Sequence, residues 1–348
     1  MEHVKTKKLV DLSMTTQFGL RPDPNDMYSS RSVGPRWASE QKQSRALSTI
    51  DMDENIKASL VADIQNFLEP SRPQWYANRG IPYRRGFLFH GPPGTGKTSF
   101  AFALAGHLKR SLFSASMNEF QSEADMKRLF AFPGRGDILL LEDIDSAGIK
   151  REAMKQEKRQ TPAHDGLEGQ SQQTGISLSG LLNAVDQSIH EGVILIMTTN
   201  SPESLDKALI RPGRIDQQYL FGNVDQAVAK SVFTRMYQDD TAPEGQRISP
   251  AIEQLATKFA AQIPHGHVTP AEIQAFLTVC ADADTAVRDV GQWVKDVVEA
   301  KRAGRNIVGA EGFHMGEGDS STAVDDDDGE KYVECSEWSD ESSKGSDV

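Results

Sequence analysis

The pattern of the apolar residues changes near Gly222. Before it, they come in short uninterrupted runs at residues 87–89, 112–113, 138–141 and 193–197, separated by polar or glycine-containing segments. Such runs are typical of strands that are buried on both faces of a parallel sheet. The segments between them are long enough for helices, so the pattern predicts an α/β domain in which helices flank a parallel sheet.

Helical spacing marks the segments on both sides of these strands. One amphipathic helix is predicted just before the first strand, starting at Met52 and ended by Pro70 and Pro73. Past the last strand, helical periodicity continues in three segments, at residues 225–237, at residues 250–262 and from Pro270 onward. This pattern predicts a small all-helical second domain.

The third segment begins with residues that are typical of a helix N-terminus. Thr269 and Glu272 have the spacing of a capping box, with Pro270 at the first helical position. His265 and His267 come just before it and could be considered as metal ligands. No third ligand is near them in the sequence, which favours ordinary loop histidines over a metal site.

The other segments carry little apolar material. Residues 1–48 mix Pro, Ser, Asp and Arg without a sustained period and are interpreted as an extended lead-in. Residues 150–175 are interpreted as an exposed polar insertion. The predicted domains are therefore an α/β domain at residues 49–222 and a helical domain at residues 223–304, followed by a tail at residues 305–348.

The negative charge of the chain is concentrated in this tail. Residues 311–348 hold 13 of the 50 acidic residues and two of the 38 basic ones, which gives them a net charge of −11, whereas the whole chain carries −12. The tail is therefore predicted to be acidic and disordered. The rest of the chain is nearly neutral, and without an excess of Lys and Arg it is not expected to bind nucleic acid.

The sequence also bears on the compartment. Cys280 and Cys335 offer neither a disulfide framework nor a cysteine-rich zinc site, which favours a reducing intracellular compartment. No stretch approaches the ~20 apolar residues that a membrane-spanning helix needs. The first residues contain neither the apolar core of a signal peptide nor a clear transit pattern.

A phosphate-binding motif follows the first predicted strand of the sheet. Residues 91–98 read G-P-P-G-T-G-K-T, which matches G-x-x-x-x-G-K-[ST] and leads into a predicted helix. Glycines let the backbone aim its N–H groups at phosphate oxygens, and the start of the helix adds the positive end of its dipole. Lys97 is predicted to bridge the β- and γ-phosphates, and Thr98 to offer its hydroxyl to Mg²⁺. The predicted nucleotide-binding residues are Gly91, Pro92, Pro93, Gly94, Thr95, Gly96, Lys97, Thr98 and Ser99.

Two later strands end in polar residues that suit such a site. The strand at residues 138–141 runs into Glu142 and Asp143, where a P-loop ATPase needs one carboxylate for Mg²⁺ and one to orient the attacking water. Asp145, two residues on, has the position of a helix cap and needs no catalytic role. Asn200 follows the last apolar run, and parallel strands bring their carboxyl ends to one edge of the sheet. Its amide is therefore predicted to bond the lytic water or the γ-phosphate, although a plain turn residue explains it equally well.

Two arginines follow on a stiff turn. Arg211 and Arg214 belong to the sequence R-P-G-R, and planar guanidinium groups stabilise charge on a transferring phosphoryl group. By themselves they would be explained as solvated arginines. Their position after a phosphate loop and an acidic pair favours a role at the phosphate.

Together these motifs resemble those of the AAA ATPases, in the segments at residues 91–98, 140–145, 198–200 and 208–216. More narrowly, the chain resembles the mitochondrial AAA chaperones that help mature the cytochrome bc1 complex by translocating the folded Rieske iron–sulfur protein. That closer resemblance is carried by Q-W-Y-A-N-R-G-I-P-Y-R-R-G at residues 74–86, E-D-I-D at 142–145, L-S-G-L-L-N-A-V-D at 178–186 and I-M-T-T-N at 196–200. It extends over roughly residues 36–277.

The resemblance implies a role for each motif residue. Glu142 and Asp143 correspond to the Walker B pair, in an order inverted from the usual Asp-Glu, so that Asp143 orients the water. Thr98 and Glu142 are then the Mg²⁺ residues. Asn200 corresponds to the first sensor.

The resemblance also implies an assembly and a location. Arg211 and Arg214 correspond to arginine fingers that act in a homo-oligomeric ring, and the helical domain corresponds to the lid. The subfamily resides at the mitochondrial inner membrane and carries a transmembrane helix and a β-rich domain ahead of the ATPase. Residues 1–48 are interpreted as a remnant of that region.

The favoured function is an ATP-hydrolysing chaperone or translocase that remodels or moves a protein as a ring, with ATP and Mg²⁺ as cofactors. The alternative is a nucleotide-binding scaffold with little turnover. A GTPase or a small-molecule kinase is disfavoured, because the N-S-P-E sequence that begins at Asn200 is not the N-K-x-D guanine reader.

Overall fold

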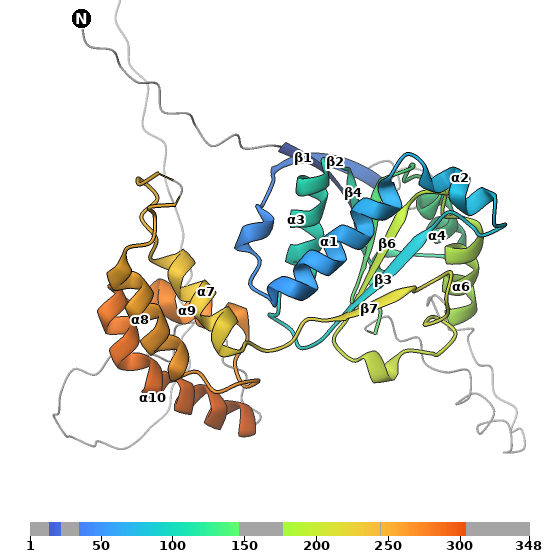
Figure 1. Ribbon diagram of the computed structural model, residues 1–348. Helices are drawn as coiled ribbons and strands as arrows, with labels where there is room; N and C mark the ends of the chain where they lie inside the picture. The colour runs from blue at the N-terminus through green and yellow to red at the C-terminus, as the bar shows by residue number, and fades with distance from the viewer. Residues whose placement is uncertain (1–13, 22–34, 146–176, 244, 304–348) are drawn as a thin grey trace, which may run out of the picture. The chain divides into compact units, whose positions relative to one another are not determined.

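The computed structural model of the protein describes residues 14–21, 35–145, 177–243 and 245–303 (Figure 1). The predicted insertion at residues 150–175 and the predicted acidic tail at residues 305–348 lie outside the described residues. Within the described residues the strands are β1 (Met14–Arg21), β2 (Arg36–Gln43), β3 (Arg85–His90), β4 (Leu112–Ser116), β5 (Ile138–Glu142), β6 (Ile194–Thr199) and β7 (Gln217–Leu220). The helices of the first domain are α1 (Glu54–Leu68), α2 (Arg72–Ala77), α3 (Lys97–Leu108), α4 (Glu123–Phe130) and α6 (Leu178–Gln187).

The strands of the described residues form one sheet in the order β2-β1-β4-β5-β6-β3-β7. All pairings are parallel except that of β1 with β2. The four apolar runs predicted as strands are β3, β4, β5 and β6, and they are adjacent in the sheet. The predicted α/β fold with a mostly parallel sheet is therefore confirmed.

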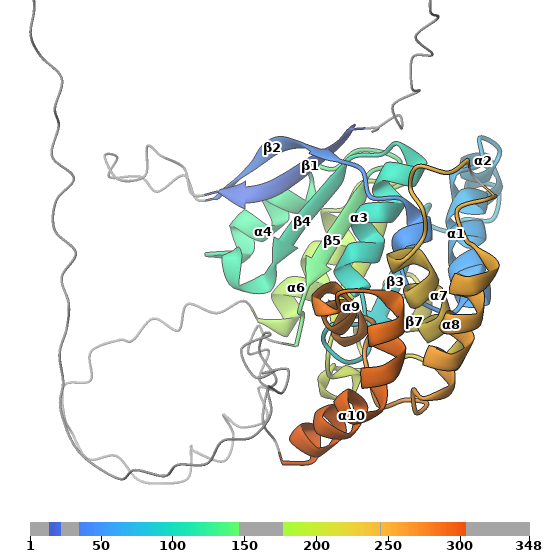
Figure 2. The same cartoon turned by 90° about the vertical axis from the view of Figure 1, so that its left-hand side faces the viewer.

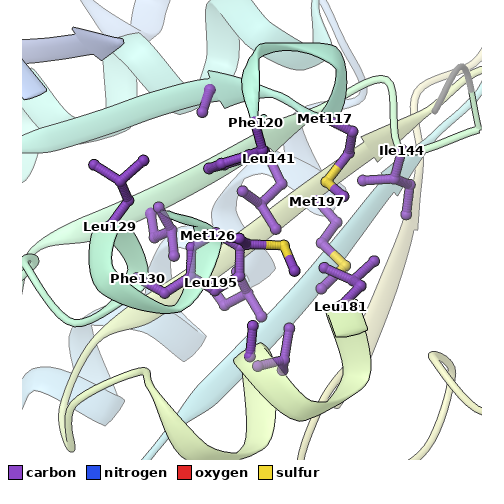
Figure 3. Close-up of a cluster of buried hydrophobic side chains, with 14 of the residues drawn as sticks. Met117, Phe120, Met126, Leu129, Phe130, Leu141, Ile144, Leu181, Leu195 and Met197 are labelled. Atoms are coloured by element: carbon purple, nitrogen blue, oxygen red, sulfur yellow. The ribbon is translucent and has the colours of Figure 1, made fainter. Parts of the chain in front are cut away.

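Helices cover both faces of the sheet (Figures 1 and 2). On one face, α1 and α3 pack against alternate residues of the strands, such as Phe87, Leu140 and Ile196. On the other face, α4 and α6 pack against the residues between them, such as Leu141 and Met197, and Figure 3 shows this cluster. Successive strand residues point to opposite faces, so continuous apolar runs are what a sheet covered on both sides requires.

Two segments of the expected lead-in at residues 1–48 are strands of the sheet. Residues 14–21 and 36–43 form the antiparallel pair β1 and β2, and β1 extends the sheet by pairing with β4. Only a few of their side chains reach the core, among them Phe18, which stacks on Phe113 at a centroid distance of 4.2 Å. Strand β2 is mostly exposed and β1 is mostly only half-buried. Neither strand therefore carries a continuous apolar run, which explains why the sequence pattern does not show them.

Two smaller elements also differ from the sequence pattern. Helix α1 ends at Leu68, close to the predicted end. Pro73, predicted to help end this helix, instead lies in the first turn of the next helix, α2. Proline is tolerated at that position because the first helical N–H groups have no intrahelical partner. Strand β7 was not predicted, since its four residues are largely exposed.

The second domain is helical, as predicted. It contains α7 (Gln226–Met236), α8 (Pro250–Ala261), α9 (Pro270–Val279) and α10 (Ala283–Arg302), around a core that includes Phe233, Phe259 and Trp293. The segment from Pro270 onward is thus two helices. The predicted capping box is confirmed, because Thr269 Oγ1 accepts from Glu272 N and Glu272 Oε2 accepts from Thr269 N.

Membrane-spanning helices and clusters of metal-ligating side chains are both absent from the described part of the chain. None of its helices is both long and apolar enough to cross a membrane. No three His, Cys, Asp or Glu side chains of the described residues gather in a way that could hold a metal ion, and this includes His265 and His267.

Replacement of Leu20 tests whether the β1–β2 hairpin belongs to the folded domain. Leu20 is 9% exposed and packs with the cluster under α4. We expect Leu20→Ala to lower the free energy of unfolding by about 2 kcal/mol, the low end for a buried leucine because this strand lies near the sheet edge. Urea unfolding measures it, with Ser39→Ala on exposed β2 as the control. Equal stability of both variants and the wild type would contradict the pairing of β1 with β4.

Candidate nucleotide-binding site

Three neighbouring strands carry the predicted motifs to one edge of the sheet. In the order β5-β6-β3, the strand β6 lies between the strand that ends at Glu142 and the strand that leads into Gly91. The strands are parallel, so their carboxyl ends meet at the same edge, where ligands bind in sheets of this kind. The end of β6, with Asn200, therefore lies between the phosphate loop and the acidic pair.

The phosphate loop needs glycine at two positions for different reasons. A Cβ on Gly91 would lie 2.1 Å from the carbonyl oxygen of Phe221, so the backbone could not pass there with any side chain. Gly96 has a φ of 92° and is the residue from which α3 starts. Left-handed backbone of this kind costs glycine almost nothing. The loop thus turns sharply into α3 and points the first N–H groups of that helix at a bound anion.

The Lys97 ammonium is the central charge of the site. It is 7% exposed and donates hydrogen bonds to the carbonyl oxygens of Gly91 and Pro92 and to Asn200 Oδ1, at 2.7 to 2.8 Å. Burial lowers the pKa of Lys97 from its ordinary value, and the nearby carboxylates of Asp143 and Asp145 act in the opposite direction. The ammonium is therefore fixed within the loop, as its predicted role at the phosphates requires.

Asn200 connects Lys97 to the acidic pair. Its Nδ2 donates to Asp143 Oδ1 at 3.3 Å, while its Oδ1 accepts from Lys97. The backbone of Asp143 is fixed as well, because its N–H donates to Thr198 Oγ1 at 3.0 Å. The predicted sensor residue thus contacts both the lysine and the predicted catalytic carboxylate. The sequence analysis did not single out this contact of Thr198 with the backbone of Asp143.

Glu142 is held between two hydroxyl groups. Thr98 Oγ1 donates to Glu142 Oε2 at 2.8 Å, and Ser114 Oγ on β4 donates to Glu142 Oε1. A hydroxyl and a carboxylate are the oxygen ligands that Mg²⁺ prefers, and this ion keeps several of its own waters in nucleotide sites. The oxygen donors of Thr98 and Glu142 therefore fit Mg²⁺. Asp145 adds a buried Oδ1 that has no hydrogen-bond partner among the described residues.

The two arginines of the R-P-G-R turn have different surroundings. Arg214 forms an ion pair with Asp186 at the end of α6, with its Nη2 2.6 Å from Oδ2, and it donates to the carbonyl oxygen of Ala208. The hydrogen bond from Arg214 lowers the pKa of Asp186 from its ordinary value. The Arg211 side chain is exposed and makes no hydrogen bond or ion pair within the described ranges. Within the described residues, no hydrogen bond or ion pair joins either arginine to the phosphate loop of its own chain.

The turn itself is attached to the start of β3 by Asp216. Its two carboxylate oxygens accept from the backbone N–H groups of Gly213 and Gly86, each at 2.9 Å. The turn is thus braced in one position, and Arg211 extends from it.

A small cavity borders the phosphate loop at Gly94, Thr95 and Gly96. It has a volume of about 140 Å³ and is lined by Ile50, Ser99, Ala271 and Gln274, among others. Its wall includes the buried carboxylate of Asp51, which accepts hydrogen bonds from Gln274 at 2.6 Å and from Arg235. Helix α9 of the helical domain therefore lines this cavity, and α7 is joined to it through the bond of Arg235 to Asp51.

The fold and the geometry define a P-loop nucleotide-binding protein: a parallel sheet, a phosphate loop with a fixed lysine, an acidic pair at the end of a neighbouring strand and a helical domain that follows the sheet. The predicted site residues Lys97, Thr98, Glu142, Asp143 and Asn200 are brought together by the hydrogen bonds described above. Arg211 and Arg214 are not part of that cluster within one chain.

Comparison with known proteins agrees with this class. The family described as "ATPase family associated with various cellular activities (AAA)" matches residues 87–223, and the "Mitochondrial chaperone BCS1-like, ATPase lid domain" matches residues 226–292. The "Probable mitochondrial chaperone BCS1-B" of Dictyostelium discoideum is 34% identical over 286 residues, which are 77% of this chain and 59% of that protein. The "Mitochondrial chaperone BCS1" of Danio rerio is 33% identical over 289 residues, 82% of this chain and 64% of its own length.

The human "Mitochondrial chaperone BCS1" is 32% identical over 271 residues, 76% of this chain and 59% of its own length. The chain carries a domain of the AAA ATPase family, followed by the lid domain of BCS1-like chaperones. The chain spans about three fifths of the length of these relatives.

Removal of the Lys97 ammonium tests the site directly. We expect Lys97→Ala to abolish nucleotide binding, because it removes the cation that is fixed inside the phosphate loop. Titration of a fluorescent ATP analogue measures the affinity, with Lys295→Ala at an exposed position of α10 as the control. An unchanged affinity in Lys97→Ala would show that the nucleotide binds elsewhere.

Proposed function

We propose that the chain is the ATPase part of a ring-forming AAA chaperone that uses ATP hydrolysis to remodel or move a protein substrate. The observation that carries this proposal is the connected set of Lys97, Asn200 and Asp143, since it links a phosphate-binding cation to a carboxylate that can orient water. The names of the relatives support a mitochondrial chaperone and, with it, a protein substrate. A nucleotide-binding scaffold with little turnover is the alternative, and steady-state release of phosphate from ATP distinguishes the two.

Each site residue has a proposed role. The phosphate loop binds the β- and γ-phosphates of ATP, and Thr98 and Glu142 hold the Mg²⁺ that accompanies it. The cavity of about 140 Å³ beside the loop is the proposed binding place of the adenine base of ATP. Mg²⁺, when bound, neutralises charge on the phosphates. Asp143 orients and deprotonates the attacking water, and Asn200 holds the carboxylate in place.

Arg211 is the proposed arginine finger, and it acts on the nucleotide of a neighbouring subunit. Its exposed side chain, on a turn that Asp216 braces, supports this role. Arg214 is instead proposed to keep the turn in place through Asp186, which differs from the expectation that both arginines are fingers. The mitochondrial inner membrane is the proposed location, on the basis of the relatives' names as mitochondrial chaperones and of the resemblance described above.

Substitution of the acidic pair separates binding from hydrolysis. We expect Asp143→Asn to retain ATP but to stop hydrolysis, because the amide keeps the shape of the side chain and cannot accept the proton of the water. Asp240→Asn, in an exposed loop of the helical domain, is the control. Nucleotide titration measures the affinity for ATP, and phosphate release measures the rate of hydrolysis. If Glu142→Gln gave this behaviour and Asp143→Asn stayed active, the proposed roles of the two carboxylates would be reversed.

Mixing of two inactive variants tests the shared site. We expect Arg211→Ala to keep ATP binding and to lose up to ~10³-fold in hydrolysis, the low end for arginine fingers. An Arg211→Ala subunit still offers an intact phosphate loop, and a Lys97→Ala subunit still offers an intact Arg211. Reassembly of the two should therefore restore measurable ATPase activity at some interfaces. The exposed lid residue Arg288 provides the control variant, Arg288→Ala, which we expect to be fully active.

The ring must be verified in the same samples. Mass photometry with and without ATP reports the number of subunits in each assembly. No recovery of activity in verified mixed rings would place Arg211 outside the mechanism or in its own subunit's site. The absence of any ring, with full ATPase activity, would contradict the proposed assembly.

A further inference from the structure

Glu142 has a second hydroxyl partner that the roles proposed above leave unexplained. Ser114 lies on β4, next to β5 in the sheet, and its Oγ donates a hydrogen bond to Glu142 Oε1. The other carboxylate oxygen accepts from Thr98. The two oxygens of Glu142 are thus fixed from opposite directions, one by the start of α3 and one by the neighbouring strand.

The register of the sheet places Ser114 where this bond can form. Ser114 is paired with Leu140, and Ser116 is paired with Glu142. Residues two apart on a strand point to the same face, so Ser114 and Glu142 lie on the face that α3 covers. Glu142 lies diagonally across from Ser114, within reach of a long side chain. The pairing of β4 with β5 therefore determines the contact.

A glutamate needs such a partner more than an aspartate does. Its side chain has one more rotatable bond, and restricting a side chain to one rotamer costs conformational entropy. A single bond from Thr98 leaves the far oxygen of the carboxylate able to rotate. A second bond to that oxygen fixes the plane of the carboxylate.

The surroundings leave room for the water that Mg²⁺ retains. A cavity of about 610 Å³ is lined by Ser114, Glu142, Asp143 and residues of β1 and β2, among others. Mg²⁺ gives up its waters reluctantly and is commonly held through them. The carboxylate that Ser114 orients can thus reach a hydrated ion.

From this geometry we infer that Ser114 is a positioning residue for the metal of the nucleotide site. It orients the Glu142 carboxylate toward the ion and does not contact the nucleotide itself. The inference rests on the proposed Mg²⁺ role of Thr98 and Glu142. Groups that hydrogen-bond to the residues of a metal site from outside tune the metal affinity by 10- to 100-fold in general.

The test compares metal affinity with nucleotide affinity in the full chain. We expect Ser114→Ala to weaken the binding of Mn²⁺, as a spectroscopic substitute for Mg²⁺, to the ATP complex by about tenfold, the low end for loss of such a partner. Electron paramagnetic resonance measures free Mn²⁺ during the titration. The affinity for a fluorescent ATP analogue in EDTA should stay unchanged, because the phosphate loop is intact. In ATPase assays the Mg²⁺ concentration for half-maximal rate should rise by a similar factor.

Two further variants separate the hydroxyl group from packing. Ser114→Thr keeps the hydroxyl on a residue that suits a strand, and we expect it to bind Mn²⁺ like the wild type. Ser116→Ala removes a hydroxyl from the same face of β4, where Ser116 caps the next turn and bonds no atom of Glu142 in the described residues. It should leave Mn²⁺ affinity unchanged.

The outcomes distinguish this inference from the proposed function. Wild-type Mn²⁺ affinity in Ser114→Ala, or a loss in Ser114→Thr as large as in Ser114→Ala, would overturn the role of Ser114 while leaving the ATPase site intact. Failure of the wild-type chain to bind ATP at all would overturn the proposed function and, with it, the inference. A loss of Mn²⁺ affinity that is confined to Ser114→Ala supports it.

Discussion

The parallel pairing of β5, β6 and β3 is the constraint on which the site depends. It brings the phosphate loop, Asn200 and the acidic pair to one edge of the sheet, with Asn200 in the middle. Lys97 begins α3, which follows β3, and Asp143 follows β5, and these two strands do not pair with each other. The amide of Asn200 bonds both residues. A slip of one residue in the register of β5 would turn Glu142 to the opposite face of the sheet, away from Thr98. The apolar runs that fix this register therefore also fix the chemistry.

The backbone of Asp143 gives a physical reason for the order of the two acids. Its φ is 47°, in the left-handed region, whereas Glu142 is the last residue of a regular strand. Aspartate is tolerated in left-handed backbone better than a longer acid, because its short side chain forms local hydrogen bonds. The longer acid at position 142 reaches Thr98 from the strand, and the shorter acid occupies the turn. The inverted Glu-Asp order thus suits the conformations that each position requires.

Part of this architecture could be predicted from the sequence because burial leaves a periodic signal. The four central strands are covered on both faces, and the capping box at Thr269 has a fixed spacing, so both were found. The β1–β2 hairpin was not predicted, since its stability comes from pairing with β4 and from a few contacts such as Phe18 on Phe113. Interactions between residues distant in sequence, such as that of Ser114 with Glu142, leave no local signal.

The different surroundings of Arg211 and Arg214 show what the motif alone could not. The sequence motif does not distinguish the two guanidinium groups. In the structure, Arg214 forms an ion pair with Asp186 at the end of α6, which joins the turn to that helix. Asp216 joins the same turn to the start of β3, where a Cβ on Gly86 would lie 1.7 Å from the carbonyl oxygen of Arg214. A turn held at both ends loses little further entropy when its exposed arginine is ordered by a phosphate. The conformational entropy of the turn is therefore already lost when one subunit folds. On the proposed mechanism the neighbouring subunit supplies only the nucleotide.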